Sequence, residues 1–206
     1  MQLALIRHGP TEWNAQGRIQ GRIDTPLSAE GRAKMAALAI PQSIRGPRAF
    51  TSPQLRARET AALLGLNNAI ADARLAEHHW GKWEGMTRAE ILARDGEDAF
   101  IRAGLGADFH PPGGESTRAL IARVQSFLTD IAKQDGNAVA VSHRGVLRTA
   151  YALATGWDMK TPMPAALDLE AVLVLDIAPD GEAKIAALNV PLIARTVSVP
   201  KTPPIP

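Results

Sequence analysis

Two short apolar runs in this chain each end in a turn that carries a histidine, and they constrain the fold more than any other feature. Residues 3–6 (Leu-Ala-Leu-Ile) lead into residues 7–9 (Arg-His-Gly), and residues 139–141 (Val-Ala-Val) lead through a serine into His143. Apolar runs of this length, bounded by turn residues, are typical of buried strands. Open α/β sheets bind their ligands at the carboxyl ends of strands. Two imidazoles at two such ends, with arginines beside them, indicate a site for a phosphate group.

The rest of the chain alternates short apolar strands with longer helical stretches. This alternation favours a mostly parallel sheet with helices on both faces, and the turn at residues 179–181 (Pro-Asp-Gly) adds a hairpin with one antiparallel edge strand. Helix starts are marked by Ser28, by Ser52 with Pro53 in the first helical position, and by a capping box that begins at Thr87. The expected helices are residues 28–39, 53–64, 87–94, 116–134 and 145–154, and the expected strands are 3–6, 48–51, 69–71, 137–142, 170–177 and 184–188.

The composition is that of an ordinary globular protein. The 206 residues fit one domain, with residues 1–195 as its globular part and residues 196–206 as an extended, proline-rich tail. Cysteine is absent, which excludes disulfides, thiolate nucleophiles and cysteine-ligated metals and is consistent with a reducing compartment. The formal net charge of +2 is too small to indicate nucleic acid. We find neither a signal peptide nor an apolar run of the roughly 18 residues that a spanning helix needs, so we expect a cytoplasmic protein.

His8 is the strongest candidate nucleophile. A neutral imidazole can attack phosphorus and so divide one phosphoryl transfer into two easier steps. One ring nitrogen must be held by a hydrogen bond so that the other faces the substrate, and carbonyl groups of the turn around Gly9 are suited to this. Arg7 and Arg56 are the candidate phosphate clamp, because guanidinium groups bind phosphate oxygens in pairs and stay charged. Arg58, on the same expected helix, is predicted to be a solvated surface arginine.

Further candidates lie in the turn after the second histidine-bearing strand and in the loop after the first. His143 stands at a strand-to-helix turn beside Arg144, where backbone N–H groups are available to an anion, and a bound phosphate would raise the pKa of His143. Asn14, Gln20 and Gly21 follow the first strand and are positioned to donate hydrogen bonds to the transferring phosphoryl group. These residues extend the predicted phosphate site beyond the two histidines.

The segment at residues 75–85, rich in His, Trp and Gly, holds two candidate acids. Dephosphorylation needs a proton for the leaving oxygen and then a base for the attacking water, and one carboxyl group can serve both steps. Glu77 and Glu84 both qualify, and their spacing does not choose between them. His78 and His79 suggest a metal, but neighbouring side chains of an extended chain point apart and no His-Glu-x-x-His spacing occurs. We therefore expect no metal and no cofactor.

Taken together, these motifs resemble the histidine phosphatase superfamily, which includes cofactor-dependent phosphoglycerate mutase, the fructose-2,6-bisphosphatase domain and α-ribazole phosphatase. The resemblance covers about residues 1–195, and its separate motifs follow in the family's order. They are residues 5–14 (LIRHGPTEWN), 17–21 (GRIQG), 24–28 (DTPLS), 52–61 (SPQLRARETA), 77–85 (EHHWGKWEG), 112–116 (PGGES) and 141–143 (VSH).

The resemblance implies a three-layer α/β/α fold and chemistry without a metal. The family often has His-Gly-Gly where this chain has His143, Arg144 and Gly145, so the Arg144 side chain either contacts the substrate or turns outward. The residue roles that the resemblance implies are a phosphorylated nucleophile at His8, a phosphate pocket of Arg7, Arg56 and His143, a proton donor at Glu77 rather than Glu84, and a phosphoryl contact at Asn14.

The leading hypothesis is a phosphomonoester hydrolase of the histidine acid phosphatase type, acting on a small phosphorylated metabolite through a phosphohistidine. Residues 85–112 are shorter than the insertions of the family's mutases, resemble the phosphatase members, and are expected to form a lid that selects the substrate. Two alternatives stay open: a phosphoglycerate-mutase-type phosphotransferase and a catalytically silent, phosphate-binding regulatory module. The expected partner is a small-molecule phosphomonoester, with neither nucleic acid nor membrane, and the sequence leaves a homodimer open.

Overall fold

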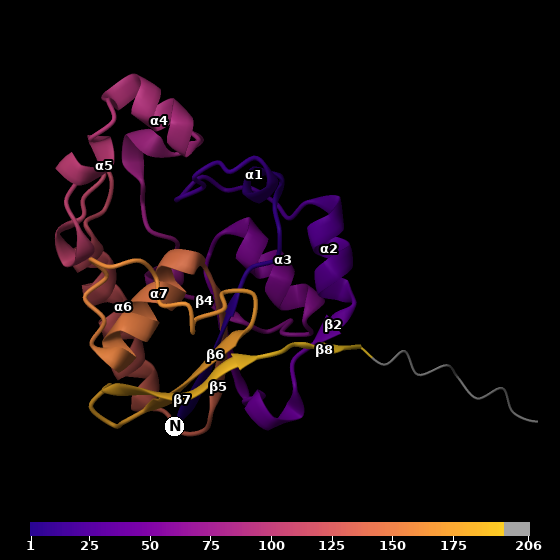
Figure 1. The fold of residues 1–206 in the computed structure, drawn as a ribbon. Coiled ribbons are helices and arrows are strands. Elements are labelled where there is room, and N and C mark those ends of the chain that lie inside the picture. Colours follow the sequence, from indigo (N-terminus) through magenta and orange to yellow (C-terminus); the bar gives the residue numbers. More distant parts are fainter. Residues whose placement is uncertain (196–206) are drawn as a thin grey trace, which may run out of the picture.

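The centre of the molecule is a six-stranded sheet (Figure 1). The computed structural model describes residues 1–195, and the predicted proline-rich tail at residues 196–206 lies outside the described residues. Strands β4, β3, β5 and β1 are parallel, β6 runs antiparallel to β1, and β7 pairs antiparallel with β6 at the edge. The order across the sheet is β4 (Ile70–Ala71), β3 (Arg48–Thr51), β5 (Ala138–Ser142), β1 (Gln2–Arg7), β6 (Val172–Ile177) and β7 (Ala183–Val190).

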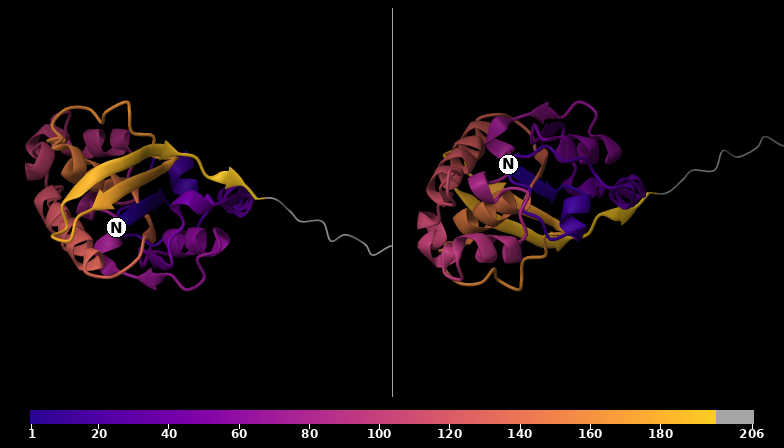
Figure 2. Two further views of the ribbon diagram at one scale, coloured as in Figure 1. Left: turned by 90° about the horizontal axis from the view of Figure 1, so that it is seen from below. Right: turned by 90° about the horizontal axis from the view of Figure 1, so that it is seen from above.

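Helices cover both faces of this sheet, so the predicted three-layer α/β/α class is confirmed (Figure 2). Side chains alternate between the two faces of a strand, and in β1 Leu3 and Leu5 join one apolar core while Ala4 and Ile6 join the other. The first core packs against α6 and α7, and the second packs against α2 and α3. The helices are α1 (Glu12–Ala15), α2 (Ala29–Ala36), α3 (Leu55–Leu63), α4 (Arg88–Asp95), α5 (Ala99–Arg102), α6 (Thr117–Ala132) and α7 (Arg144–Thr155).

The predicted lid at residues 85–112 carries α4 and α5, which lie above the carboxyl ends of the parallel strands in Figure 1. A small apolar core of its own holds it together, with Trp83, Ile91 and Ala99 buried against Phe100 and Phe109. The predicted capping box begins α4: the Thr87 hydroxyl accepts from the backbone N–H of Glu90, and the backbone N–H of Thr87 donates to the Glu90 carboxylate. The lid is therefore a folded unit placed over the edge where ligands bind in open α/β sheets.

Two local predictions were wrong because tertiary contacts outweighed local preference. The helix that Ser28 caps ends at Ala36 rather than at residue 39, because Leu38–Ala39 (β2) pairs with Ile193–Ala194 (β8), far along the chain. Ser52 does not cap α3, which begins after Gln54 without a side-chain cap. The Ser52 hydroxyl instead lies 2.7 Å from a ring nitrogen of His143, and this pairing across the sheet explains why the serine is extended rather than helical.

Candidate active site

The two histidine-bearing turns meet at one edge of the sheet. Strands β1 and β5 are parallel neighbours in register, with Arg7 opposite Ser142, and the backbone N–H of His8 donates to the Ser142 carbonyl at 2.9 Å. The rings of His8 and His143 lie 5.1 Å apart between centroids at an angle of 57°. The two rings are therefore close neighbours, as a site shared by one tetrahedral ion requires.

His8 is held as a neutral imidazole with one free nitrogen. Its Nδ1 lies 2.7 Å from the Gly9 carbonyl oxygen, which can only accept, so Nδ1 carries the proton and Nε2 keeps its lone pair. Thr60 accepts from the Gly9 N–H at 2.9 Å and fixes that turn. Burial, and next the positive charges of Arg56 and Arg7, lower the pKa of His8 to about 3. The hydrogen bond to the Gly9 turn that the sequence predicted for His8 is therefore present.

His143 is fully buried beside His8. Its Nε2 is paired with the Ser52 hydroxyl, and its Nδ1 is buried without a hydrogen-bond partner among residues 1–195. Burial, followed by the nearby His8, holds the pKa of His143 well below its usual value. An unpaired buried nitrogen is costly unless a ligand meets it, although His143 itself is not among the residues that line the cavity described below.

Arg7 and Arg56 bring two guanidinium groups to the same place. Arg56 has no exposed surface, and its two terminal nitrogens donate to the carbonyls of Ile23 and Gly21 at 2.9 Å each. Burial lowers the pKa of both arginines, and neither forms an ion pair with a carboxylate in the described part of the chain. Arg58 is exposed on α3 and does not line the cavity, as predicted. Arg56 is buried and Arg7 is half-buried, and two such charged groups without counter-ions indicate an anion site.

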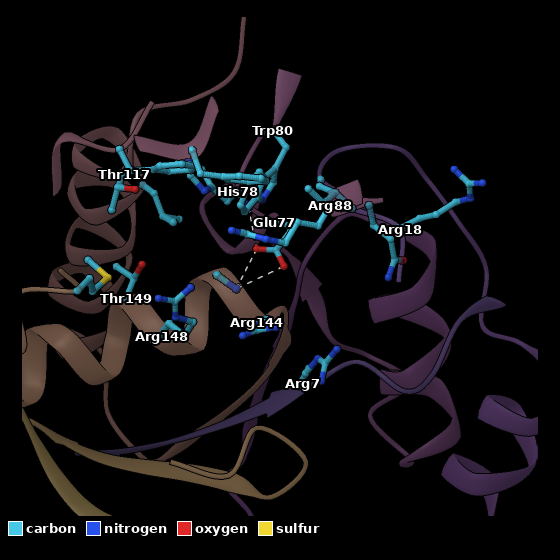
Figure 3. Close-up of a pocket in the computed structure, with 18 of the residues that line it drawn as sticks. Arg7, Arg18, Glu77, His78, Trp80, Arg88, Thr117, Arg144, Arg148 and Thr149 are labelled. Atoms are coloured by element: carbon cyan, nitrogen blue, oxygen red, sulfur yellow. Dashed lines mark hydrogen bonds between the residues drawn. The ribbon is translucent and has the colours of Figure 1, made fainter. Parts of the chain in front are cut away.

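The two candidate carboxylates occupy different environments. Glu77 lines the cavity, and its carboxylate accepts from the Gly145 N–H at 3.0 Å and from the N–H of His78 at 2.8 Å (Figure 3). Glu84 does not line the cavity; it accepts from the backbone N–H groups of Arg22 at 2.8 Å and Trp80 at 3.0 Å. Glu84 therefore holds a loop, whereas Glu77 faces the space where a ligand would bind.

The loop after β1 supplies the polar side chains that the sequence singled out. Asn14, Gln20 and Gly21 all line the cavity. The side-chain oxygen of Asn14 accepts in the capping box at Thr11, and the side-chain oxygen of Gln20 accepts from the Thr25 hydroxyl at 2.6 Å. The side-chain amide nitrogens of Asn14 and Gln20 can therefore donate to a ligand. Gly21 has a φ of +51°, and a Cβ there would overlap the carboxylate of Glu84. This glycine lets its carbonyl reach Arg56.

A cavity of about 640 Å³ joins these groups to the lid. Arg144 lines it, so its side chain turns toward the ligand space rather than outward. Arg148 and Thr149 also line it and were missed by the sequence analysis, although the i, i+4 spacing of the two arginines on α7 places them on one helix face. The apolar part of the wall comes mainly from the lid and its neighbours: Trp13, Ile19, Trp80, Phe100, Leu105, Phe109 and Leu120.

Within residues 1–195, His78 and His79 do not belong to a metal site, because no group of three or more His, Asp or Glu side chains there could hold a metal ion. The His78 ring instead pairs with the Glu115 carbonyl oxygen at 2.6 Å, and His79 lies 3.7 Å from Glu84. Among the described helices, none is long and apolar enough to cross a membrane.

We expect the free energy of unfolding to fall as the pH drops from about 6.5 toward about 3. The fold keeps His8 neutral, and burial lowers the pKa of His78 and His143 as well, whereas the unfolded chain binds protons at these rings near pH 6.5. The stability that these groups contribute is complete above pH 6.5 and is lost through this window. Urea unfolding at about pH 7 and about pH 5 measures this loss of stability. His8→Ala should make the free energy of unfolding depend less on pH. If the variant showed the same pH dependence as the wild type, the lowered pKa of His8 would be contradicted.

Comparison with known proteins agrees with this geometry. The model of the histidine phosphatase superfamily (branch 1) matches residues 3–190. A glucosyl-3-phosphoglycerate phosphatase of Mycobacterium tuberculosis is 34% identical over 160 residues, which cover 71% of each chain. A 2,3-bisphosphoglycerate-dependent phosphoglycerate mutase of Gloeobacter violaceus is 34% identical over 128 residues, 56% of each chain. The solved structure of the α-ribazole phosphatase from Shigella flexneri superposes with a TM-score of 0.72 at 26% identity and covers 95% of this chain and 100% of its own.

This chain therefore belongs to the histidine phosphatase superfamily. The similar proteins include both phosphatases and a mutase, and the phosphatase from Mycobacterium tuberculosis matches over more of the chain than the mutase does.

Proposed function

We propose that this protein is a phosphomonoester hydrolase that acts on a small phosphorylated metabolite through a phosphohistidine at His8. The observation that carries the proposal is the neutral His8 ring, with Nε2 free, 5.1 Å from His143 in a cavity lined by arginines. Such a ring is a nucleophile for phosphorus, and the surrounding charges bind its substrate. The phosphatases among the similar proteins support a small phosphorylated metabolite as the substrate class.

In the first step the phosphate dianion binds between Arg7, Arg56 and the unpaired Nδ1 of His143. Nε2 of His8 attacks phosphorus, a P–N bond forms and the P–O bond to the leaving group breaks. The leaving oxygen takes a proton from Glu77, which enters the step as the carboxylic acid. The negative charge of the bound phosphate raises the pKa of His143 and favours its protonated form as a donor.

In the second step a water molecule replaces the departed alcohol. The Glu77 carboxylate takes one proton from this water as its oxygen attacks phosphorus, the P–N bond breaks, and phosphate leaves with His8 restored. In the transition state the phosphorus and its three equatorial oxygens become coplanar. The proposed hydrogen-bond donors to these oxygens are the side chains of Asn14 and Gln20 and the N–H of Gly21, and the fixed charges of Arg7 and Arg56 stabilise the transition state.

The alternative within the same family is a mutase, which would return the phosphoryl group to a bound intermediate instead of to water. Purified protein incubated with 3-phosphoglycerate and a trace of bisphosphoglycerate separates the two functions. We expect release of inorganic phosphate without isomerisation. Isomerisation to 2-phosphoglycerate without phosphate release would overturn the hydrolase proposal.

A silent regulatory module is the less favoured alternative, because the nucleophile, the arginine clamp and both carboxylate candidates are all present in this chain. A panel of phosphomonoesters that includes p-nitrophenyl phosphate tests it. Binding of phosphate with no turnover of any ester in the panel would favour the module.

The remaining expectations stay predictions. They are a single domain over residues 1–195, a cytoplasmic location, action without a cofactor, no nucleic-acid partner, and a homodimer as one assembly that gel filtration can test. The narrower histidine acid phosphatase type is supported by the low pKa of His8, which keeps the nucleophile neutral in acid. A pH–rate profile that stays high down to about pH 4 is expected for that type.

A further inference from the structure

The cavity contains far more positive charge than one phosphate requires. Its lining includes six arginines, whereas Glu77 is the single carboxylate among the described lining residues. Arg18 at the rim is paired with Glu90 at 3.0 Å, and Arg88 lies over the ring of Phe100 at 4.3 Å. The six arginines are Arg7, Arg18, Arg56, Arg88, Arg144 and Arg148.

The proposed chemistry uses only Arg7 and Arg56, and of the other four arginines Arg144 and Arg148 lie together on α7. They lie one turn apart on α7, and neither has a carboxylate partner within residues 1–195. Like charges at i, i+4 repel each other, and burial together with Arg144 lowers the pKa of Arg148. A ligand anion near both guanidinium groups would remove this cost.

These two arginines extend away from the phosphate end of the cavity. Arg144 is the first residue of α7, directly after His143, and Arg148 lies one turn further along the helix, so Arg148 is the farther of the two from the histidine-bearing turn. Glu77, the proposed donor to the leaving oxygen, accepts from the Gly145 N–H at 3.0 Å at the start of the same helix, so the leaving group would lie beside α7. Figure 3 shows Arg148 rising from α7 on the side that faces Glu77.

Thr149 provides an independent sign of a ligand at this end. Its side chain is only 1% exposed, it lines the cavity, and its hydroxyl is buried without a partner in the described structure. Helical threonines usually satisfy the hydroxyl on the carbonyl four residues back. Thr60 does so on Arg56 at 2.7 Å, and Thr155 does so on Tyr151 at 2.8 Å. The Thr149 hydroxyl departs from this pattern, since it makes no such bond in a side chain that lines the cavity.

The Arg148 guanidinium is held in place for binding. It lies over the Trp157 ring at 5.3 Å from the centroid, which restricts the side chain. Its Nε is buried and unpaired in the described structure, as is the neighbouring Thr149 hydroxyl. An oriented cation and a hydroxyl donor beside each other match the oxygens of a carboxylate or phosphate.

We infer that Arg148, Thr149 and Arg144 form a second anion subsite, which binds a carboxylate or a second phosphate on the leaving group of the substrate. This inference rests on the proposed function, because the leaving group is defined by the hydrolysis at His8. It narrows the substrate class from any small phosphomonoester to one whose alcohol is itself anionic. The apolar lid wall surrounds the remainder of that alcohol.

Matched substrate pairs test the subsite. 3-Phosphoglycerate and glycerol 3-phosphate differ in a carboxylate, and fructose 1,6-bisphosphate and fructose 6-phosphate differ in a second phosphate. For at least one pair we expect kcat/KM to favour the doubly anionic member by about 10- to 100-fold, as charged hydrogen bonds predict. Arg148→Met should abolish that preference while p-nitrophenyl phosphate turnover stays within about twofold, since that ester does not reach the subsite with an anion.

Two further variants keep the result interpretable. Thr149→Val preserves shape, and it should reduce the preference by about 3- to 10-fold through the loss of one hydrogen bond to a charged group. Arg58→Met removes an exposed arginine outside the cavity and should leave the preference unchanged. No preference in either pair, or an equal loss on all substrates in both cavity variants, would overturn the subsite.

Binding separates this inference from the proposed function. In the His8→Ala background, calorimetric titration with the same four compounds reads affinity without turnover. A preference for the doubly anionic compound that Arg148→Met removes supports the subsite even if the wild-type protein hydrolyses nothing, in which case the proposed function has failed. Equal affinities within each pair would reject the subsite whether or not hydrolysis occurs.

Discussion

Replacing His8 by alanine is expected to lower phosphatase turnover by on the order of 10⁴- to 10⁶-fold, the range seen when an enzyme loses its nucleophile. The reason is that Nε2 of His8 is the free imidazole nitrogen near Arg7 and the buried Arg56, whereas Nδ1 of the same ring donates to the Gly9 carbonyl. Acid-labile phosphate on the protein, trapped by rapid quenching with ³²P-labelled substrate, should disappear in the same variant.

The matched control is His110→Ala, which removes an exposed histidine that does not line the cavity. It should retain wild-type turnover and labelling. If the His8 variant still turned over substrate at a rate near that of the wild type, or still became phosphorylated on histidine, another group would be the nucleophile and the proposed mechanism would fail.

Glu77→Gln is expected to slow hydrolysis of alkyl phosphates by about 10²- to 10⁴-fold, the usual contribution of a general acid. The effect on p-nitrophenyl phosphate should be much smaller, because the nitrophenolate leaves without needing a proton. Glutamine keeps the carbonyl oxygen that accepts from the N–H groups of Gly145 and His78, so the turn should persist. Steady-state kcat/KM for both substrates gives the comparison.

Glu84→Gln serves as the control for this carboxylate. Glu84 accepts from backbone N–H groups of its loop and does not line the cavity. Its replacement should change the rates for both substrate types by the same factor. Equal losses on both substrates in the Glu77 variant would argue against a proton donor there, and a selective loss in the Glu84 variant would assign the role to Glu84.

Several features of the fold were predictable because short-range physics determines them. The apolar runs that became β1 and β5 are buried on both faces, and only continuous apolar sequence can satisfy that position. The helix caps at Ser28 and Thr87 are hydrogen bonds to residues three positions further on, so both partners of each bond lie within one short stretch of sequence. The pairing of Nδ1 of His8 with the adjacent Gly9 carbonyl is local in the same sense.

Other features could not be predicted because their partners are distant in the sequence. Ser52 has the form of an N-cap, yet its hydroxyl pairs with His143, 91 residues away. Which of the two carboxylates lines the cavity depends on distant partners: Glu77 accepts from the Gly145 N–H, and Glu84 accepts from the Arg22 N–H. The buried, unpaired Thr149 hydroxyl has no local signature, since the sequence shows a threonine in a helix and nothing of what lies above it.

The amino-acid sequence alone therefore determined the strands of the central sheet and most helix starts, because these follow from apolar pattern and local hydrogen bonding, and its motifs were enough to indicate the family. Tertiary structure alone decided which of the two carboxylates lines the cavity, how burial keeps the His8 ring neutral, and which residues of α7 line the same cavity. These properties depend on burial and on distances between groups far apart in the chain, and both are set only when the layers pack together.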